Sequence, residues 1–282
     1  MSKLLNAEFH RLLHFKLYFI ECAAAVLYPL YLMSIMTYST QPDIDSYLFT
    51  IMAPFGYLSA VCVSQFIGTE HSNRTFNNKL FTGHTRAEIF FTQLILHFLA
   101  GVNVLNLSVL TVVISGAIRG WVYEFPFITL LGCYLMCVCT IFFITAVSVF
   151  VSMLNRSNMA SFIILFALAL ALETIGGDLK VKLIYPEYRM PYTSEIMAGQ
   201  TEPVKNGLYA GGSERTLYEC LLLMNPYAQA NYEYVPMYDT DEAYIQSKIM
   251  EYPLVKIFLF SAVESTVLIF AGISVFRKKD LK

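Results

Sequence analysis

One acidic side chain in this sequence stands inside a long apolar run, where an ionisable group is costly. Glu264 lies near the middle of residues 254–276 and is flanked by Ser261 and Ser265. A charged group at mid-membrane depth costs about 2.5–3.5 kcal/mol on insertion scales, so it should face a protein interior or a wet path. Two interpretations stay open. Glu264 and the two serines line a substrate pathway or a subunit interface, or the carboxyl group forms a structural hydrogen bond to another helix.

Other side chains with possible chemistry lie in two further apolar runs. Gln93 and His97 stand four residues apart and share a helical face, and Cys133, Cys137 and Cys139 cluster in the next run. A zinc site would need more His, Cys or carboxylate partners on matching faces, so interhelical hydrogen bonds and small-residue packing are favoured. The sequence contains no Gly-x-x-x-x-Gly-Lys-Ser/Thr loop. We therefore expect no catalytic residue, no metal site and no ATP hydrolysis by this chain.

The polar segment 68–86 is too long for a minimal turn between two helices. It predicts a short helix with Glu70, Arg74, Asn77 and Asn78 on its polar side and with Phe76, Leu80 and Phe81 opposite, ended by Gly83. A solvated loop is the plain interpretation of such a composition. The alternative is a structured loop that binds a partner.

The composition explains how these side chains are positioned. Charged residues make up 14% of the 282 residues, against roughly 25% in soluble domains, and hydrophobic residues make up 56%. A soluble enzyme is therefore disfavoured, and the net charge of −2 gives no signature of nucleic-acid binding. A membrane-spanning helix needs about 20 apolar residues. Six stretches qualify: residues 17–36, 47–67, 89–118, 127–153, 159–175 and 254–276.

The basic residues predict the orientation of these six segments. Cytoplasmic loops are enriched in Lys and Arg, and the two short loops on the opposite side hold only Arg119. Both termini are therefore expected in the cytoplasm. The eleven basic residues on that side are Lys3, Arg11, Lys16, Arg74, Lys79, Arg86, Arg156, Arg277, Lys278, Lys279 and Lys282.

The connection 176–253 is long enough to form a small extracellular domain. It holds eleven acidic and six basic residues, and eleven of the nineteen tyrosines but none of the 22 phenylalanines. Tyr suits a ring with one wet edge, whereas Phe suits lipid or dry core. We expect one helix capped by Ser213 and running through Met224, and a second that starts at Asp239 or Thr240 and runs through Met250.

The residues before the first apolar run form an amphipathic pattern over 4–16. Leu5, Phe9, Leu12 and Leu13 recur at helical spacing, with polar residues between them. Such a helix lies in the headgroup plane or simply anchors the first span. The sequence thus predicts an all-α membrane protein of six transmembrane helices with an N-terminal interface helix. Its parts are 1–175 with the cytoplasmic loop 68–86, the extracellular domain 176–253, and the last helix and basic tail 254–282.

The order of short motifs around the loop 68–86 resembles the ABC-2 type transporter permeases. That family carries Gly-x-Glu near the end of its second span, then Asn-Gly-Thr-apolar and a basic-polar patch with Leu, then Gly-x-Ser/Thr-Arg before the third span. Arg74 stands where the family has Gly. The C-terminal residues 276–281 also resemble the family's basic-Asp-apolar tail. The matching residues are Gly68-Thr69-Glu70, Asn73-Arg74-Thr75-Phe76-Asn77-Asn78-Lys79-Leu80 and Gly83-His84-Thr85-Arg86.

The resemblance implies the membrane subunit of an ATP-driven exporter in a bacterial plasma membrane. A separate ATPase would bind ATP and Mg, this chain would hold no cofactor, and a second permease subunit, identical or paralogous, would complete the path. The favoured substrate is an amphipathic or antimicrobial peptide. The alternatives are export of a lipid or glycolipid, an intramembrane enzyme using His97 and Glu264, and a non-transporting sensor or immunity protein. By resemblance, the loop is the coupling helix, and the residues that couple to the ATPase are Glu70, Arg74, Thr75, Phe76, Asn77, Lys79, Leu80 and Arg86.

Overall fold

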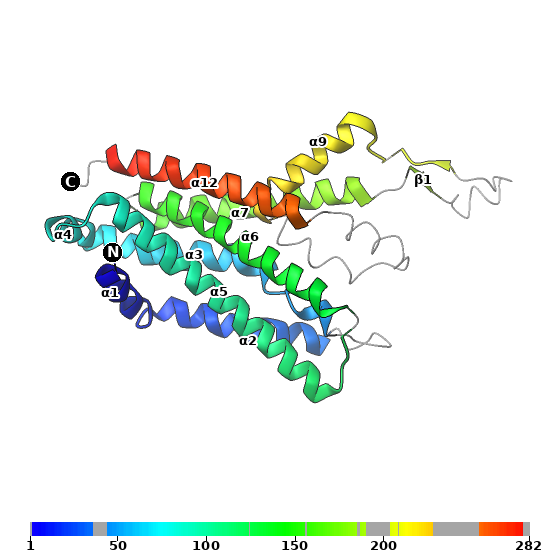
Figure 1. The fold of residues 1–282 in the computed structure, drawn as a ribbon, viewed down its shortest axis with the longest axis horizontal. Coiled ribbons are helices and arrows are strands. Elements are labelled where there is room, and N and C mark those ends of the chain that lie inside the picture. Colours follow the sequence, from blue (N-terminus) through cyan, green and yellow to red (C-terminus); the bar gives the residue numbers. More distant parts are fainter. Residues whose placement is uncertain are drawn as a thin grey trace.

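A computed structural model describes residues 2–35, 44–123, 125–155, 157–184, 187–189, 204–207, 209–227 and 254–278. Six long helices run along the bundle, and two short ones, α1 and α4, lie at one of its ends (Figure 1). The predicted helix ending at Met250, together with Arg156, Lys279 and Lys282, lies outside the described residues. The helices of the bundle and of this end are α1 Ser2–Leu12, α2 Lys16–Ile35, α3 Met52–Ser72, α4 Thr75–Phe81, α5 Arg86–Arg119, α6 Phe127–Leu154, α7 Asn158–Ile184 and α12 Leu254–Lys278. A 3-10 turn, η1, covers Asp45–Tyr47.

Four of the long helices are apolar and long enough to cross a membrane. These are α2, α5, α6 and most of α7, and a shorter apolar segment covers Leu259–Val275 of α12. The helix α3 is more polar because it lies inside the bundle, where it packs against α2, α5, α6 and α7. Twelve of its 21 residues are buried, Ser59, Ser64 and Glu70 among them. A helix that meets other helices rather than lipid can carry such residues, since neighbouring helices supply hydrogen-bond partners.

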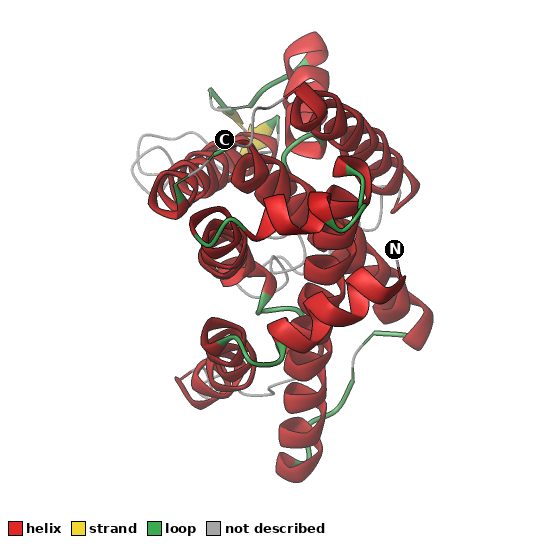
Figure 2. Ribbon diagram, turned by 90° about the vertical axis from the view of Figure 1, so that its left-hand side faces the viewer, coloured by secondary structure: helices red, strands yellow, loops and turns green. Residues whose placement is uncertain are grey.

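Two apolar clusters form the core of the bundle. One joins α2, α3, α5 and α6 around Phe55 and Ile141, and the other joins the ends of α1, α3, α5 and α6 around Phe66 and Phe90. Against the second cluster pack Leu268 and Ile273 of α12. Figure 2 looks along the bundle from the end that carries α1 and α4 and shows several long helices nearly end-on.

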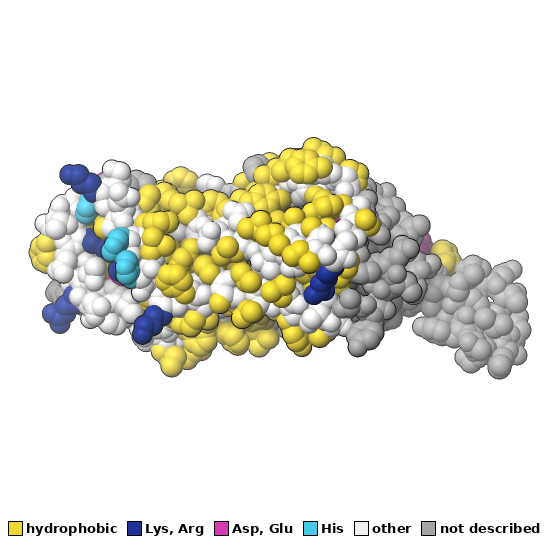
Figure 3. Space-filling view, turned by 90° about the horizontal axis from the view of Figure 1, so that it is seen from below, with side chains coloured by type: hydrophobic (Ala, Val, Ile, Leu, Met, Phe, Trp, Pro, Cys, Tyr) yellow, Lys and Arg dark blue, Asp and Glu magenta, His cyan; other side chains and the backbone are white. Residues whose placement is uncertain are grey.

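The two ends of the molecule differ in chemistry. The helices α1 and α4 and the last residues of α12 share one end (Figure 1). On the face shown in Figure 3, most of the Lys, Arg and His side chains gather at that end, and the flank of the bundle is largely hydrophobic. A hydrophobic flank with cations at one end is the pattern expected of a membrane protein whose charged end faces the cytoplasm.

The opposite end is built differently from the expectation. The helix α7 does not end at Ile175 but continues through Gly176 and Gly177 to Ile184. The antiparallel pair β1 (Tyr188–Arg189) and β2 (Val204–Lys205) follows, and then α9, Gly212–Leu223. Leu222 of α9 packs on the α7 extension, which gives that extension an apolar partner. The predicted cap was wrong, because Gly211 precedes α9 without a side-chain cap and Ser213 lies within its first turn.

Candidate functional site

The connection between α3 and α5 is built by residues with unusual backbone requirements. Arg74 begins α4 with a φ of 53°, in the left-handed region that favours glycine. Gly83 ends α4 with a φ of 92°, as predicted, and the N–H of His84 donates to the carbonyl of Lys79. Thr85 then caps α5, because its hydroxyl accepts from the N–H of Glu88 while the Glu88 carboxylate accepts from the N–H of Thr85. Each turn residue of the motif thus has a structural role.

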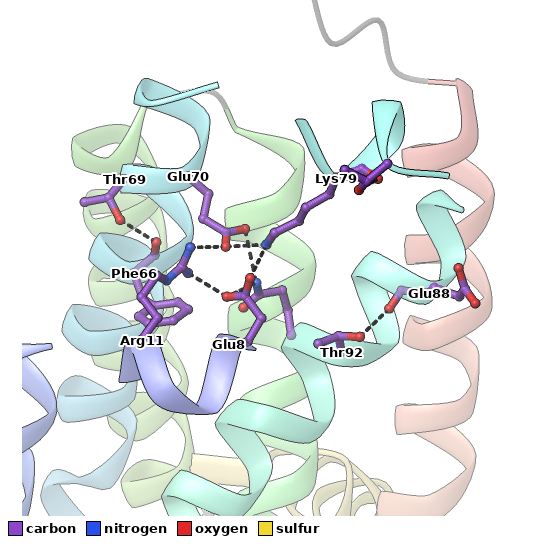
Figure 4. A network of polar contacts seen from close by, with 10 residues as sticks. Glu8, Arg11, Phe66, Thr69, Glu70, Lys79, Glu88 and Thr92 are labelled. Carbon is purple, nitrogen blue, oxygen red and sulfur yellow. Dashed lines mark hydrogen bonds and ion pairs between the residues drawn. The ribbon is translucent and has the colours of Figure 1, made fainter. Parts of the chain in front are cut away.

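Four helices meet at a buried cluster of charges (Figure 4). Lys79 of α4 places its Nζ 2.6 Å from Oε1 of Glu8 in α1 and 2.5 Å from Oε1 of Glu70 in α3. Arg11 of α1 pairs with both acids, at 3.0 Å to Glu8 and in close contact with Glu70. The side-chain amide of Gln93 in α5 donates to Glu70 at 3.1 Å. We call Glu8, Arg11, Glu70, Lys79 and Gln93 the charged junction.

The charged junction is balanced and shielded from solvent. Two carboxylates share one ammonium and one guanidinium group, and Glu70 is only 1% exposed. Burial raises the pKa of Glu8, but the attraction of Lys79 and Arg11 outweighs it, so the pKa falls below its ordinary value. Breaking a buried ion pair by removing one partner is strongly destabilising. The cluster therefore fixes α4 firmly against α1 and α3.

Aromatic rings surround the charged junction. The guanidinium of Arg11 lies 3.8 Å from the centroid of the Phe66 ring, a cation–π contact. Phe76 of α4 is 2% exposed and packs beside His71. The rings keep water from the ion pairs on these sides, which strengthens their attraction.

The face of α1 that packs on the bundle coincides only partly with the apolar pattern of its sequence. Leu4, Glu8 and Leu12 are buried, one helical turn apart, whereas Phe9 and Leu13 are exposed. A glutamate lies on the packed face because the charged junction supplies its partners. The exposed Phe9 and Leu13 leave an apolar surface on the other side of α1.

The faces of α4 were also predicted incorrectly. Glu70 belongs to α3, and the buried side of α4 consists of Phe76 and Lys79, with Leu80 half-buried. Phe81 does not share that side and is 88% exposed. It lies five residues beyond Phe76, about 140° around the helix at ~100° per residue. The remaining predicted coupling residues are half-buried or exposed: Arg74, Thr75, Asn77 and Arg86.

The motif glycine Gly68 allows a close approach of two helices. A Cβ built there would stand 2.1 Å from Cβ and 2.7 Å from Cα of Asn158, the first residue of α7. Asn158 also donates its side-chain amide to Gln65 at 3.0 Å. The start of α7 is thereby held against the end of α3, next to the charged junction.

The predicted pathway residues lie within one turn of α12 and differ in burial. Ser261 and Ser265 are buried, four residues apart, on the packed side of the helix. Glu264 is half-buried and stands at the border with an exposed apolar stripe, Leu259, Val263, Val267 and Phe270. Its Oε2 atom is buried without a hydrogen-bond partner among the described residues. The helix thus turns the two serines into the bundle and leaves Glu264 beside them at its edge.

The remaining candidate groups, His97 and Gln93, are buried between helices. No group of three or more His, Cys, Asp or Glu in the described part of the chain could hold a metal ion. His97 packs edge-on against Phe66, and Gln93 joins the charged junction. The interhelical hydrogen bond expected of Gln93 is present, whereas sequence reasoning did not find the roles of Glu8, Arg11 and Phe81. A signal was present only for Glu8 and Arg11, which are oppositely charged and three residues apart on one helix.

Comparison with known proteins identifies one family. A family model described as ABC-2 family transporter protein matches residues 4–171, more than half of the chain. The matched region runs from α1 into α7 and contains the whole charged junction and α4. No curated protein and no solved structure is similar enough to match.

Proposed function

The chain belongs to the ABC-2 family of transporter proteins, and from this premise we propose that it is the permease subunit of an exporter driven by a separate ATPase. In this proposal all six long helices, α3 and α12 included, cross the membrane. Both termini lie in the cytoplasm, and α1 rests in the headgroup plane through Phe9 and Leu13. The end that carries α4 then faces the ATPase.

One observation carries the assignment of α4 as the coupling helix. Its buried face is fixed by Phe76 and Lys79, while Phe81 projects almost fully exposed from the same short helix. An aromatic side chain on a rigid support is a typical binding anchor, because little conformational entropy is lost when a partner buries it. Movement of an attached ATPase would pass through the charged junction to α1, α3 and α5.

The charged junction gives Glu70 and Lys79 a different role from Phe81. Glu70 and Lys79 position α4, and Phe81 contacts the ATPase, with Arg74 and Asn78 on the exposed side beside it. Substitution of a junction residue would disturb folding and coupling together. Phe81 is therefore the residue that tests docking alone.

Co-purification tests this function. A tagged chain expressed with its candidate ABC ATPase should retain that ATPase and stimulate ATP turnover. The variant Phe81→Ser should lose both properties while the chain remains folded. A matched control is Phe127→Ser, since Phe127 is 79% exposed at the opposite end of the bundle. Equal ATPase retention by Phe81→Ser and the wild type would contradict the docking role of α4.

The substrate proposed is an amphipathic or antimicrobial peptide, moved between this subunit and a second permease subunit. The excess of acidic residues in 176–253 supports a cationic substrate at the exit side. Glu264, at the border of the exposed stripe of α12, is proposed to face the second subunit. Uptake of a fluorescent cationic peptide into inverted vesicles corresponds to export from the cell. If this uptake depends on ATP and on the ATPase, it supports this part of the proposal.

A further inference from the structure

Glu173 of α7 is an acidic residue at the end of the bundle opposite α4. Glu173 follows an apolar stretch of α7 and is half-buried. Its Oε2 accepts a close hydrogen bond from the hydroxyl of Tyr57 in α3. Among the described residues, no basic side chain forms an ion pair with it. The carboxyl group thus accepts a hydrogen bond from a tyrosine hydroxyl but has no basic partner within the described part of the chain.

A buried tyrosine lies beside this pair. Tyr227 is 4% exposed, and its hydroxyl has no hydrogen-bond partner among the described residues. Its ring packs directly on α3, because a Cβ built at Gly56 would stand 2.1 Å from Cε1 of Tyr227. Burial, and then Tyr57 and Glu173, raise the pKa of the Tyr227 phenol. The hydroxyl therefore lies within electrostatic range of both groups.

Two contacts hold Tyr227 in this position. The side-chain amide of Asn225 donates to the carbonyl of Leu172 at 2.6 Å, and its oxygen accepts from the N–H of Tyr227 at 3.1 Å. Asn225 thus ties the segment after α9 to the helical turn that carries Glu173. An unpaired phenol in so well fixed a position normally has a partner, because an unsatisfied buried hydroxyl is costly.

Further aromatic rings complete the surroundings of Glu173. Tyr28 of α2 lies within electrostatic reach of the carboxylate, and Phe166 of α7 packs on Tyr57 with ring centroids 5.1 Å apart. One carboxylate with several aromatic rings suits an ammonium group, which gains both an ion pair and cation–π contacts. A calcium or magnesium ion is disfavoured, since it requires more oxygen ligands.

We propose that Glu173, Tyr57, Tyr227 and Tyr28 form a binding site for a primary ammonium group at the outer end of the bundle. The family match ends at residue 171, so Glu173 and Tyr227 belong to the part of the chain that lies outside it. The ammonium group comes from a lysine side chain of a peptide or from an ethanolamine lipid headgroup. Binding of the ammonium group needs no ATPase and so does not depend on the proposed function. Only a role of this site in export rests on that function.

The test uses the purified chain without an ATPase, in phosphatidylcholine nanodiscs, with calorimetric titration. The probe is the peptide acetyl-Gly-Lys-Gly-amide, and its counterpart has norleucine in place of lysine and so lacks only the ammonium group. We expect the lysine peptide to bind at least about tenfold more tightly than the norleucine peptide. Glu173→Gln should remove this preference, and Tyr227→Phe, which deletes only the hydroxyl, should reduce it by a smaller factor.

A matched control is present in the same chain. Glu214 accepts a hydrogen bond from Tyr218 on the exposed surface of α9, so it forms the same kind of acid–tyrosine pair away from the site. Glu214→Gln should leave the lysine preference unchanged. If Glu173→Gln does not fold, Tyr57→Phe replaces it, because that variant keeps the carboxylate and removes its hydrogen-bond donor.

The outcomes distinguish a lipid ligand from a soluble amine. They also test the ammonium site separately from the docking of an ATPase on Phe81. Weaker binding of the lysine peptide in nanodiscs that contain phosphatidylethanolamine supports the site with a lipid as its ligand. Unchanged binding supports it with a soluble amine as its ligand. Equal binding of the two peptides, or full binding by Glu173→Gln, overturns the site and leaves the ATPase result with Phe81 untouched.

Discussion

The Nζ atom of Lys79 lies 2.6 Å from Oε1 of Glu8, so the helix α4 is ionically joined to the first helix of the chain. Lys79 also contacts Glu70, and both acids are buried. A single lysine thus connects α1, α3 and α4. This relationship predicts that the proposed coupling helix and the N-terminal helix move as one unit.

The first prediction concerns the loss of that lysine. Lys79→Met leaves two buried carboxylates with one guanidinium group and should destabilise the fold by about 3–5 kcal/mol. Thermal unfolding in detergent measures the effect, with Lys3→Met on the exposed side of α1 as the control. Adding Glu8→Gln to Lys79→Met should recover part of the loss, because charge balance is restored. Equal stability of the two lysine variants would contradict the role of the junction.

The second prediction compares two phenylalanines of one short helix. Phe76→Ala removes a buried ring and should cost about 3–5 kcal/mol, whereas Phe81→Ala removes an exposed ring and should leave the melting temperature nearly unchanged. Circular dichroism melts of the two variants measure the difference. A large loss of stability in Phe81→Ala would show that this ring is packed.

The third prediction follows from the backbone of Arg74. Its φ of 53° is strained for a residue with a Cβ, so Arg74→Gly should stabilise the chain by about 0.5–1 kcal/mol. Asn73, at a φ of −87°, provides the control, since Asn73→Gly gains no relief of strain. The melting temperatures of both variants measure the effect. A melting temperature of Arg74→Gly below that of the wild type would contradict the strain at Arg74.

The fourth prediction tests the close contact of α3 with α7. Gly68→Ala places a methyl group against the backbone of Asn158 and should cost about 1–3 kcal/mol through overpacking. Gly177→Ala is the matched control, because a Cβ there meets no atom within 4 Å and the residue lies inside a helix. It should stabilise the chain slightly, by up to about 1 kcal/mol. Chemical denaturation of both variants would show opposite shifts.

The fifth prediction concerns Glu264. If it faces a second subunit or the substrate, Glu264→Gln should keep the fold and change export or its pH dependence in inverted vesicles. If it only makes a structural hydrogen bond, Gln should be nearly silent and Glu264→Leu should weaken subunit assembly, measured by size-exclusion chromatography. Normal export and assembly of the Leu variant would rule out both roles.

The sequence alone determined the elements and the class of protein. Long runs without charge set the positions of the long helices to within a few residues for α2, α5, α6 and α12, because apolar length is a local property of the chain. The order of short motifs between 68 and 86 indicated the family by resemblance. The helix stop at Gly83 was predictable because turn chemistry depends on neighbours in sequence. The helix α7 ran further than predicted because its continuation packs on α9, a partner that composition does not reveal.

Only the tertiary structure decided which side chains meet. Glu8, Glu70, Lys79 and Gln93 come from four helices, and their burial became visible only when those helices packed together. A helix as short as α4 has too few residues for its apolar face to be read from periodicity, so a buried lysine and an exposed phenylalanine were both unexpected. Polar side chains can be buried wherever partners neutralise them, and those partners are set by packing rather than by sequence spacing. For that reason the sequence located the polar loop 68–86, and the fold decided which of its residues are buried in the charged junction and which one, Phe81, is exposed.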